Sequence, residues 1–193
     1  MRRQAVRRAL CGVAYMYTTP EISTNQNRMI NMEIRFLTQN DDLSVISNIY
    51  ECSWKSAYRG IIPQDYLDSI PQGRWANSIT RAGMTSLVLS SHGKIIGTAS
   101  FCKSRWEQFS DYGEIVSIYF LPEYTGRGYG VHLLNRCISE LQQCGYSKFL
   151  LWVLEGNTNA RHFYEKNGFT NSGVSRNDCI GGKALRELMY TRT

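Results

Sequence analysis

A glycine-rich segment has the clearest capacity for chemistry in this sequence. It reads Gly126, Arg127, Gly128, Tyr129, Gly130, and it lies between a run of strand-forming residues and an amphipathic helical pattern. Glycines leave main-chain amides uncovered, and the first amides of a helix bind phosphate because they lack partners within the helix. Arg127 adds a positive charge to the same turn. The segment therefore predicts a binding site for a phosphate or diphosphate group.

Two well-known phosphate-binding loops do not fit this segment. A Walker loop ends in Lys-Ser or Lys-Thr, and this pair is absent here. The dinucleotide fingerprint needs a preceding strand and a later acidic residue at fixed offsets, and neither falls at its place. A tight turn that uses glycine only for its backbone angles is the structural alternative, and the segment alone leaves both open.

The glycine segment and a downstream pattern together resemble the GNAT superfamily of acyl-CoA-dependent N-acetyltransferases. The family's phosphate motif, Q/R-x-x-G-x-G/A, maps onto residues 125–130, with Thr125 in place of Gln or Arg. Its second motif, N-x-x-A-x-x-F-Y followed by G-F, maps onto Asn157, Ala160, Phe163, Tyr164 and Gly168-Phe169. The resemblance covers residues 32–190 in element order and is sharpest over residues 114–169.

This resemblance implies a fold, a co-substrate and a reaction. The fold is α/β (α+β): a mostly antiparallel central sheet of about six to seven strands flanked by helices, with a splayed parallel strand pair forming the acyl-CoA cleft. The co-substrate is acetyl-CoA, with no metal. An acetyl group passes directly to a primary amine of a small molecule or peptide in a ternary complex. The residues assigned to acetyl-CoA are Ile118, Tyr119, Phe120, Thr125, Gly126, Arg127, Gly128, Tyr129, Gly130, Val131, Asn157 and Tyr164.

The resemblance also assigns catalytic roles. A thiol titrates near ~8.5 and a tyrosine near ~10, so Tyr164 could protonate the departing sulfur as general acid. Glu114 lies where several family members carry a catalytic carboxylate; a solvated charge at a strand end is its alternative. Asn157 would hydrogen-bond the cofactor arm. The main chain of residues 118–120 would face that arm, where an amide could polarise the thioester carbonyl.

Three residues between the first two predicted helices are candidates for the acceptor site. Trp54, Tyr58 and Arg59 lie in the region that varies with substrate in this family, and aromatic rings there could hold a cationic amine. Trp54 and Tyr58 are four residues apart, so they could instead pack into the core as one helix face. For Trp54 the packing interpretation is favoured. The sequence does not identify the amine.

From Met32 onward, strand and helix patterns alternate, as expected for elements that position such a site. A first helix begins at a cap among Asn40, Asp41 and Asp42. Gly145 and Gly168 follow two helical patterns as expected terminators. The predicted strands are 34–37, 86–89, 95–101, 114–121, 149–154 and 185–190, and the later helices 65–70, 74–80, 131–141 and 159–167.

Composition bounds the class of protein. The chain has 193 residues, 42% of them hydrophobic, with no uninterrupted apolar run of the ~20 residues that a membrane-spanning helix needs. Six cysteines are scattered without a Cys-x-x-Cys pair, which indicates reduced thiols, a cytoplasmic location and no metal site. The length predicts one N-acetyltransferase domain, residues 32–193, and leaves a homodimer open.

The positive charge is concentrated at the N-terminus. Residues 1–31 hold five arginines and one glutamate, which is +4 of the net +6. We expect a disordered basic extension or an over-long start there, with a targeting peptide as the alternative. The near-neutral remainder argues against nucleic-acid binding. Two other functions stay open: an acyl-CoA-binding module that senses without turnover, and a nucleic-acid-binding protein that uses the basic arm.

Overall fold

The computed structural model describes residues 32–193, and its centre is one seven-stranded sheet. The strand order is β1-β2-β3-β4-β5-β7-β6, and every neighbouring pair is antiparallel except β4 with β5. This confirms the predicted fold class. The strands are β1 Met32–Phe36, β2 Thr85–Ser91, β3 Lys94–Lys103, β4 Tyr112–Phe120, β5 Lys148–Leu154, β6 Thr170–Ile180 and β7 Lys183–Arg192. Predictions on residues 1–31 lie outside the described residues.

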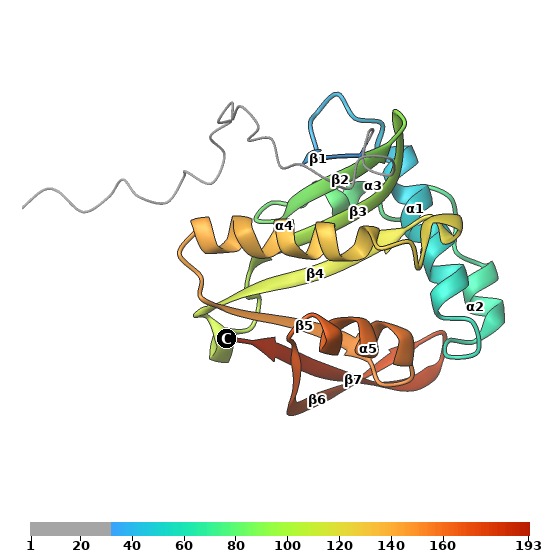
Figure 1. The fold of residues 1–193 in the computed structure, drawn as a ribbon. Coiled ribbons are helices and arrows are strands. Elements are labelled where there is room, and N and C mark those ends of the chain that lie inside the picture. Colours follow the sequence, from blue (N-terminus) through green and yellow to red (C-terminus); the bar gives the residue numbers. More distant parts are fainter. Residues whose placement is uncertain (1–31) are drawn as a thin grey trace, which may run out of the picture. The chain divides into compact units, whose positions relative to one another are not determined.

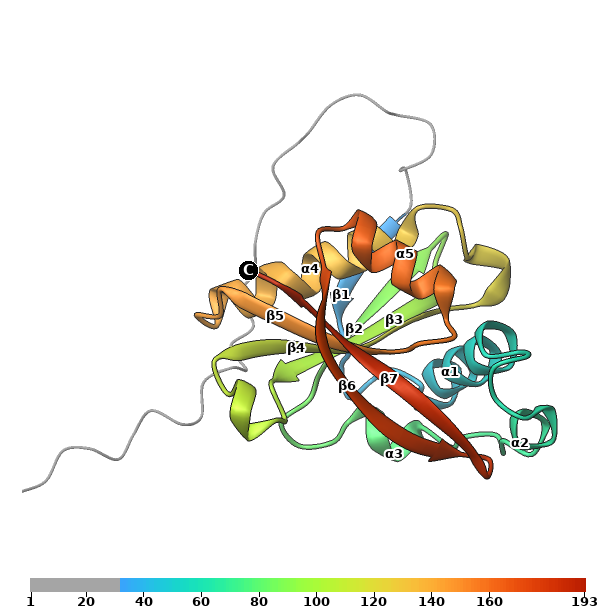
Figure 2. The same cartoon turned by 90° about the horizontal axis from the view of Figure 1, so that it is seen from below.

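Helices cover both faces of the sheet. The helices are α1 Leu43–Ala57, α2 Gln64–Asp68, α3 Ala76–Ile79, α4 Tyr129–Gln143 and α5 Thr158–Lys166. In Figure 2, α4 and α5 lie on one side of the sheet, and α1 and α3 lie on the other. The main core forms between α4 and the sheet residues that face it, and a smaller cluster joins α1 and α3 to the opposite face. Strand β4 is thus contacted by α1 on one face of the sheet and by α4 on the other.

Local sequence signals explain how the helices next to the site begin and end. Asp42 caps α1, because its carboxylate accepts from the Ser44 amide at 2.8 Å. Neighbouring Asp41 instead binds Arg35 through both carboxylate oxygens, at 2.6 and 2.8 Å. Beyond α4 and α5, Gly145 and Gly168 adopt left-handed φ values of 92° and 82°. The predicted cap and both predicted terminators are therefore confirmed.

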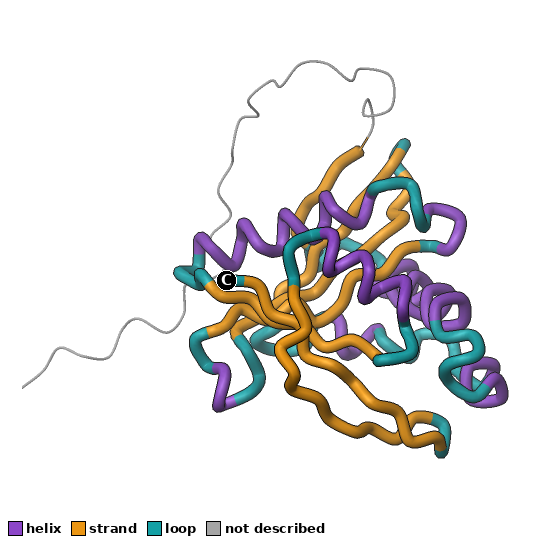
Figure 3. The backbone as a smooth tube through the Cα atoms, turned by 60° about the horizontal axis from the view of Figure 1, so that its bottom comes forward, coloured by secondary structure: helices purple, strands orange, loops and turns teal. Residues whose placement is uncertain are grey.

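The C-terminal hairpin was predicted only in part. The sequence predicted a last strand over 185–190, whereas β7 runs from Lys183 to Arg192 and pairs with the unexpected strand β6. Figure 3 shows the two strands side by side as a long hairpin. No residue of β6 is fully buried, because it is an edge strand. Without a buried face it has no apolar alternation by which the sequence could have revealed it.

The parallel strands β4 and β5 separate soon after they pair. Their pairing is limited to Tyr112 with Lys148, Gly113 with Phe149, and Glu114 with Leu150. Beyond Glu114, β4 continues to Phe120 along β3 alone. In Figure 1 the two strands lie together at one end and diverge towards the other. The residues of β4 from Ile115 to Phe120, called here the open stretch, therefore have one unpaired edge.

Candidate active site

The glycine loop joins the open stretch of β4 to the N-terminus of α4. Gly126 and Gly128 adopt left-handed φ values of 76° and 89°, and a Cβ atom on either would meet nothing within 4 Å. Gly128 is the N-cap of α4, and no side chain caps its amides. Positive φ explains why glycine is used, and the open space leaves these amides accessible to an anion. The geometry fits the predicted phosphate cradle.

Gly130 has a different structural role from the other two loop glycines. A Cβ atom at Gly130 would lie 3.1 Å from the ring of Phe163 on α5. That distance is tighter than ordinary van der Waals contact. The absence of a side chain therefore lets α4 and α5 pack closely at the wide end of the β4–β5 splay. The predicted contact of Gly130 with the cofactor stays a prediction, and the structure adds this helix contact.

Two cations accompany the loop. The guanidinium carbon of Arg127 lies 5.4 Å from the centre of the Tyr124 ring, and Lys94 Nζ lies 5.6 Å from the same ring. Lys94 begins β3, so the fold brings it to the loop from 30 residues away. Lys94 also lies 3.7 Å from Glu123 in an exposed ion pair. The loop thus combines uncapped amides with the positive charges of Arg127 and Lys94, a suitable environment for a diphosphate.

Alternate residues of the open stretch direct their main-chain groups away from β3. The Leu121 amide donates to Ile96 on β3 at 2.9 Å, so antiparallel alternation directs the main chain of Phe120 and Ile118 away from β3. Ser53 of α1 accordingly engages both main-chain groups of Phe120: the Phe120 amide donates to Ser53 Oγ at 3.2 Å, and the Ser53 hydroxyl donates to the Phe120 carbonyl. By the same alternation the Tyr119 main chain faces β3. Its side chain, however, packs towards α1.

Three tyrosines gather beside the open stretch. Trp54 Nε1 donates to the Tyr119 hydroxyl at 3.1 Å, and the hydroxyls of Tyr58 and Tyr119 are 3.5 Å apart. Burial raises the pKa of Tyr58 to about 12, and nearby Tyr164 contributes to that rise. Tyr119 in turn adds to the raised pKa of Tyr164. Tyr58, at the C-cap of α1, and Tyr119 of β4 therefore lie against each other, and Tyr164 of α5 is close enough to influence the pKa of Tyr58.

Tyr164 is held by aromatic packing and stays protonated. Its ring contacts Phe163 and Phe169, with centroids 5.2 and 6.0 Å away. Burial, then Tyr119 and Cys137, raises the pKa of Tyr164 above its ordinary value of 10. Burial also raises the pKa of the Cys137 thiol to about 12. Tyr164 can therefore supply a proton, whereas this neighbouring cysteine is a poor nucleophile.

Asn157 is the N-cap of α5. Its Oδ1 accepts from the Ala160 amide at 3.1 Å. Within residues 32–193 its Nδ2 makes no hydrogen bond, so this donor is free for a ligand. The predicted contact with the cofactor arm stays a prediction.

Glu114 is buried at the last paired position of β4. It is 1% exposed, so the alternative of a solvated strand-end charge is wrong. Arg105 Nη2 donates to its Oε1 at 2.6 Å, and the Nε and main-chain amide of Arg105 donate to its Oε2 at 3.1 and 2.9 Å. Both carboxylate oxygens are therefore engaged by one residue, which lies in the β3–β4 connection.

A cavity of about 220 Å³ borders the open stretch on the α1 face. Ser117 and Tyr119 of β4 line it, together with Trp54 of α1. Trp54 is therefore partly exposed to the cavity and not simply core. Arg59 does not line it: this residue is exposed and forms an isolated main-chain bridge with Ile62. Because this cavity borders the open stretch and is lined by titratable side chains, it is the candidate acceptor site.

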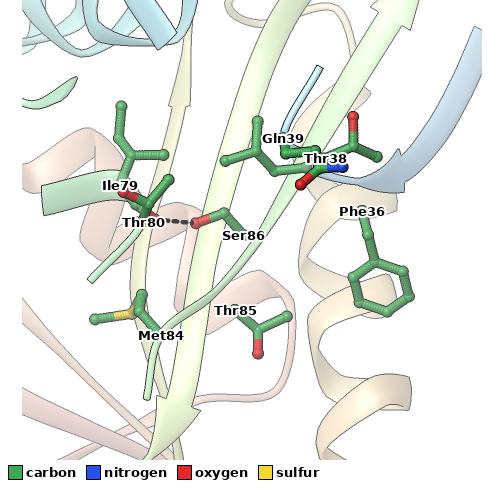
Figure 4. A pocket seen from close by; sticks show the side chains of 9 residues that line it. Phe36, Thr38, Gln39, Ile79, Thr80, Met84, Thr85 and Ser86 are labelled. Atoms are coloured by element: carbon green, nitrogen blue, oxygen red, sulfur yellow. Dashed lines mark hydrogen bonds between the residues drawn. The ribbon is translucent and has the colours of Figure 1, made fainter. Parts of the chain in front are cut away.

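A second hollow of about 320 Å³ lies elsewhere, between β1, β2 and the α3 region. Figure 4 shows its lining, where Ser86 donates to the main-chain oxygen of Ile79 at 3.1 Å. The described residues around it include no titratable side chain. It is therefore unsuited to acyl transfer despite its larger volume.

Sequence reasoning missed several charged residues near the site. Arg81 and Arg105 line the acceptor cavity, and both come from connections between elements. Glu187 of β7 forms an ion pair with Arg176 and influences the pKa of both Tyr58 and Arg105. No local motif marks these residues, because only the tertiary fold brings them to the site.

Residues 32–193 contain neither a cluster of metal-ligating side chains nor a membrane-spanning helix. No group of three or more His, Cys, Asp or Glu side chains is arranged to hold a metal ion. None of the described helices has the length and apolar character needed to cross a membrane.

Comparisons with known proteins agree with this geometry. The model of the acetyltransferase (GNAT) family matches residues 46–169. The L-amino acid N-acyltransferase MnaT of Escherichia coli is 30% identical over 141 residues, which is 72% of this chain and 79% of MnaT. The [ribosomal protein bS18]-alanine N-acetyltransferase of Haemophilus influenzae is 32% identical over 135 residues, 70% of this chain and 87% of the relative.

A solved structure shows the same fold. The PaiA N-acetyltransferase of Thermoplasma acidophilum, in complex with coenzyme A, superposes with a TM-score of 0.68 at 24% identity. The match covers 85% of this chain and 99% of PaiA. The family model spans more than half of the sequence. The chain therefore belongs to the acetyltransferase (GNAT) family and is an acetyl-CoA-dependent N-acetyltransferase.

Proposed function

We propose that this chain acetylates a primary amine of a small molecule or peptide by direct attack of the amine on acetyl-CoA in a ternary complex. One observation carries the proposal. The open stretch of β4 leads into the N-terminus of α4, whose amides no side chain caps, and it runs beside Tyr58, Tyr119 and Tyr164. A phosphate cradle, an unpaired main-chain edge and a proton donor thus follow one another along one path. This order matches the order of groups in acetyl-CoA.

The residues that would hold acetyl-CoA follow from that path. The first amides of α4, with Arg127 and Lys94, would bind the diphosphate. The main chain of Ile118 would pair with the pantetheine arm, and Asn157 Nδ2 would donate to it. Acetyl-CoA supplies an activated acyl group, so the chain itself needs no covalent intermediate. The raised pKa of the buried thiols of Cys102, about 11, and Cys137, about 12, supports this.

Tyr164 would donate a proton to the leaving sulfur and later regain one. The bond between the amine nitrogen and the acyl carbon forms while the carbon–sulfur bond breaks, and the phenol gives its proton to the sulfur. The nitrogen loses a proton, which returns through water to the phenolate. Because the leaving thiol titrates near ~8.5, and the raised pKa of Tyr164 keeps it protonated, the donor is available at neutral pH.

Glu114 is less suited than Tyr164 to direct proton transfer. Both of its oxygens accept hydrogen bonds from Arg105. A base must reach the proton it removes, and a carboxylate already engaged on both oxygens reaches it only through water. We therefore propose Glu114 as the residue that positions Arg105 at the acceptor cavity. The family resemblance implies instead that Glu114 is the general base. The kinetics of Glu114→Gln distinguish the two roles.

The acceptor is not decided by the relatives, since one is named for amino acids and another for an alanine of a ribosomal protein. The test is thiol release from acetyl-CoA with a panel of amines, run beside calorimetry of acetyl-CoA binding. We expect binding, and thiol release that depends on the acceptor. Binding without release for every amine would favour the sensing module.

We further propose a cytoplasmic location and a homodimer. The buried thiols of Cys102 and Cys137 support a reducing compartment. The strand β6 supports association, because an edge strand offers unpaired main-chain groups to a second copy. Light scattering on the purified chain tests the dimer, and fractionation of cells tests the location.

A further inference from the structure

The acceptor cavity combines aromatic walls with positive charge. The rings of Tyr50, Trp54, Trp75 and Tyr119 line it and contact one another, with centroids 4.8 to 5.8 Å apart. Its charged lining residues are arginines, and no Asp or Glu occurs among the described residues that line it. A cavity intended for a polycationic acceptor would need carboxylates there, because unlike charges attract and like charges repel. The arginines that line this cavity therefore favour an acceptor that carries a negative charge.

Among the described residues that line the cavity, Arg81 carries a positive charge that no carboxylate pairs with. It follows α3, is exposed, and its guanidinium makes no hydrogen bond or ion pair with any residue between Met32 and Thr193. Other arginines near the site are engaged: Arg105 binds Glu114, and Arg176 binds Glu187. A guanidinium without a protein partner at the mouth of a cavity is well placed to bind an anionic group of a ligand.

Arg105 offers a second set of donors on the same cavity. Its Nε and Nη2 are directed at Glu114, and Nη1 makes no hydrogen bond in the described part of the chain. Because Glu114 neutralises Arg105, the arginines together present about one net positive charge, which suits a single anionic group. The fixed planar guanidinium matches the two oxygens of a carboxylate.

The volume limits the acceptor further. Drug-sized ligands occupy pockets of roughly 300–1,000 Å³. The cavity measures about 220 Å³. It therefore accommodates a compact molecule with a flat or aliphatic side chain and excludes an oligosaccharide-sized amine.

Resting on the proposed function, we propose that the acceptor is a small primary amine with a carboxylate close to its nitrogen and an apolar side chain, as in an apolar α-amino acid. Arg81 and Arg105 bind the carboxylate, and the aromatic rings contact the side chain. The amine then lies against the open stretch of β4. The arginines act as specificity-determining residues, because they select the anionic acceptor over its neutral analogue.

The test compares acids with their amides on the full-length chain. Leucine, methionine and phenylalanine are each offered as the free acid and as the primary amide, with spermidine as the polycation, and thiol release from acetyl-CoA gives kcat/KM. A hydrogen bond to a charged group contributes enough to change an equilibrium by about tenfold or more. We therefore expect the acids to exceed their amides by about tenfold or more, and spermidine to be poorest.

The variant Arg81→Met tests whether Arg81 causes the preference for the free acid over its amide. It removes the charge and keeps the length, so we expect the acid to lose about tenfold in kcat/KM while the amide changes little. The control is Arg74→Met: this exposed arginine lies 5.8 Å from the Trp75 ring but does not line the cavity. It should leave both substrates unaffected.

The outcomes separate this inference from the proposed function. Amides acetylated as well as acids, or equal losses for acid and amide in Arg81→Met, would overturn the anionic acceptor, while the thiol release itself would uphold acetyl transfer. Absence of thiol release with every acceptor would overturn both.

Discussion

Glu114 and Arg105 form an ion pair in which the carboxylate is 1% exposed and the guanidinium 47% exposed. The pair therefore extends from the buried end of the β4–β5 ladder to the rim of the acceptor cavity. Hydrogen bonds to both carboxylate oxygens fix the plane of the guanidinium. The carboxylate that the family resemblance implies as a base is thus paired with an arginine that lines the candidate acceptor cavity.

Glu114→Gln should impair acceptor binding more than the acetyl-transfer step. The amide cannot hold Arg105 by charge, so we expect the acceptor KM to rise about tenfold, while acetyl-CoA affinity and the shape of the kcat–pH profile persist. Steady-state kinetics across neutral pH measure this. Glu51→Gln is the matched control, because Glu51 is buried too but binds Ser47 and the Gly73 amide. A large fall in kcat with loss of the acidic limb would instead identify Glu114 as the base.

Tyr164→Phe should lower kcat by about a hundredfold, within the range of 10²–10⁴ that general acid catalysis contributes. The change keeps the ring contacts with Phe163 and Phe169, so acetyl-CoA affinity by calorimetry should stay constant. Tyr112→Phe, at the paired end of β4, is the control. An unchanged kcat at every pH would leave Tyr164 with a packing role only.

Gly128→Val should abolish acetyl-CoA binding. A β-branched residue is strained at φ 89°, and its side chain would cover the amides of α4. Gly145→Val is a matched control, because Gly145 has φ 92° at the other end of α4 and equally open surroundings. We expect similar losses of thermal stability in both variants, and loss of binding in Gly128→Val alone. Equal affinity in the two variants would refute the phosphate cradle.

Local signals made much of the fold predictable from the sequence. The Asp42 cap and the Gly145 terminator act within one turn of the chain, so their residue types suffice. The pairing of β2 with β3 was equally local, because His92 and Gly93, both at positive φ, close a two-residue turn between Ser91 and Lys94. The glycine loop and the Tyr164 helix were predictable because each motif is contiguous.

The acceptor cavity could not be predicted in the same way. Arg81 and Arg105 come from two connections, and their shared cavity exists only once α1 and α3 pack on the sheet. Trp54 has the spacing of a core residue, and only the tertiary contact with Tyr119 shows that it borders a cavity. The role of Gly130 depended likewise on Phe163, which is distant in sequence. Long-range packing, which no local pattern encodes, determines these features.

The tyrosine cluster predicts a loss of stability at alkaline pH. Burial raises the pKa of Tyr58 to about 12 and raises those of Tyr119 and Tyr164 as well. In the unfolded chain these phenols titrate near ~10, so between that value and the folded pKa the unfolded state binds fewer protons. Stability is therefore fully present below about pH 10 and falls as pH rises, by at most about 1.4 kcal/mol per pH unit for each tyrosine.

Thermal unfolding monitored from neutral to strongly alkaline pH measures this loss, and tyrosinate absorbance separates it from titration of the thiols of Cys102 and Cys137, whose pKa is also raised. In the double variant Tyr58→Phe, Tyr164→Phe, two phenols no longer titrate, so its melting temperature should decline less steeply above about pH 10. The single variant Tyr112→Phe serves as the control. Parallel declines in the double variant and the unmodified chain would show that these hydroxyls are solvated and do not share a buried site.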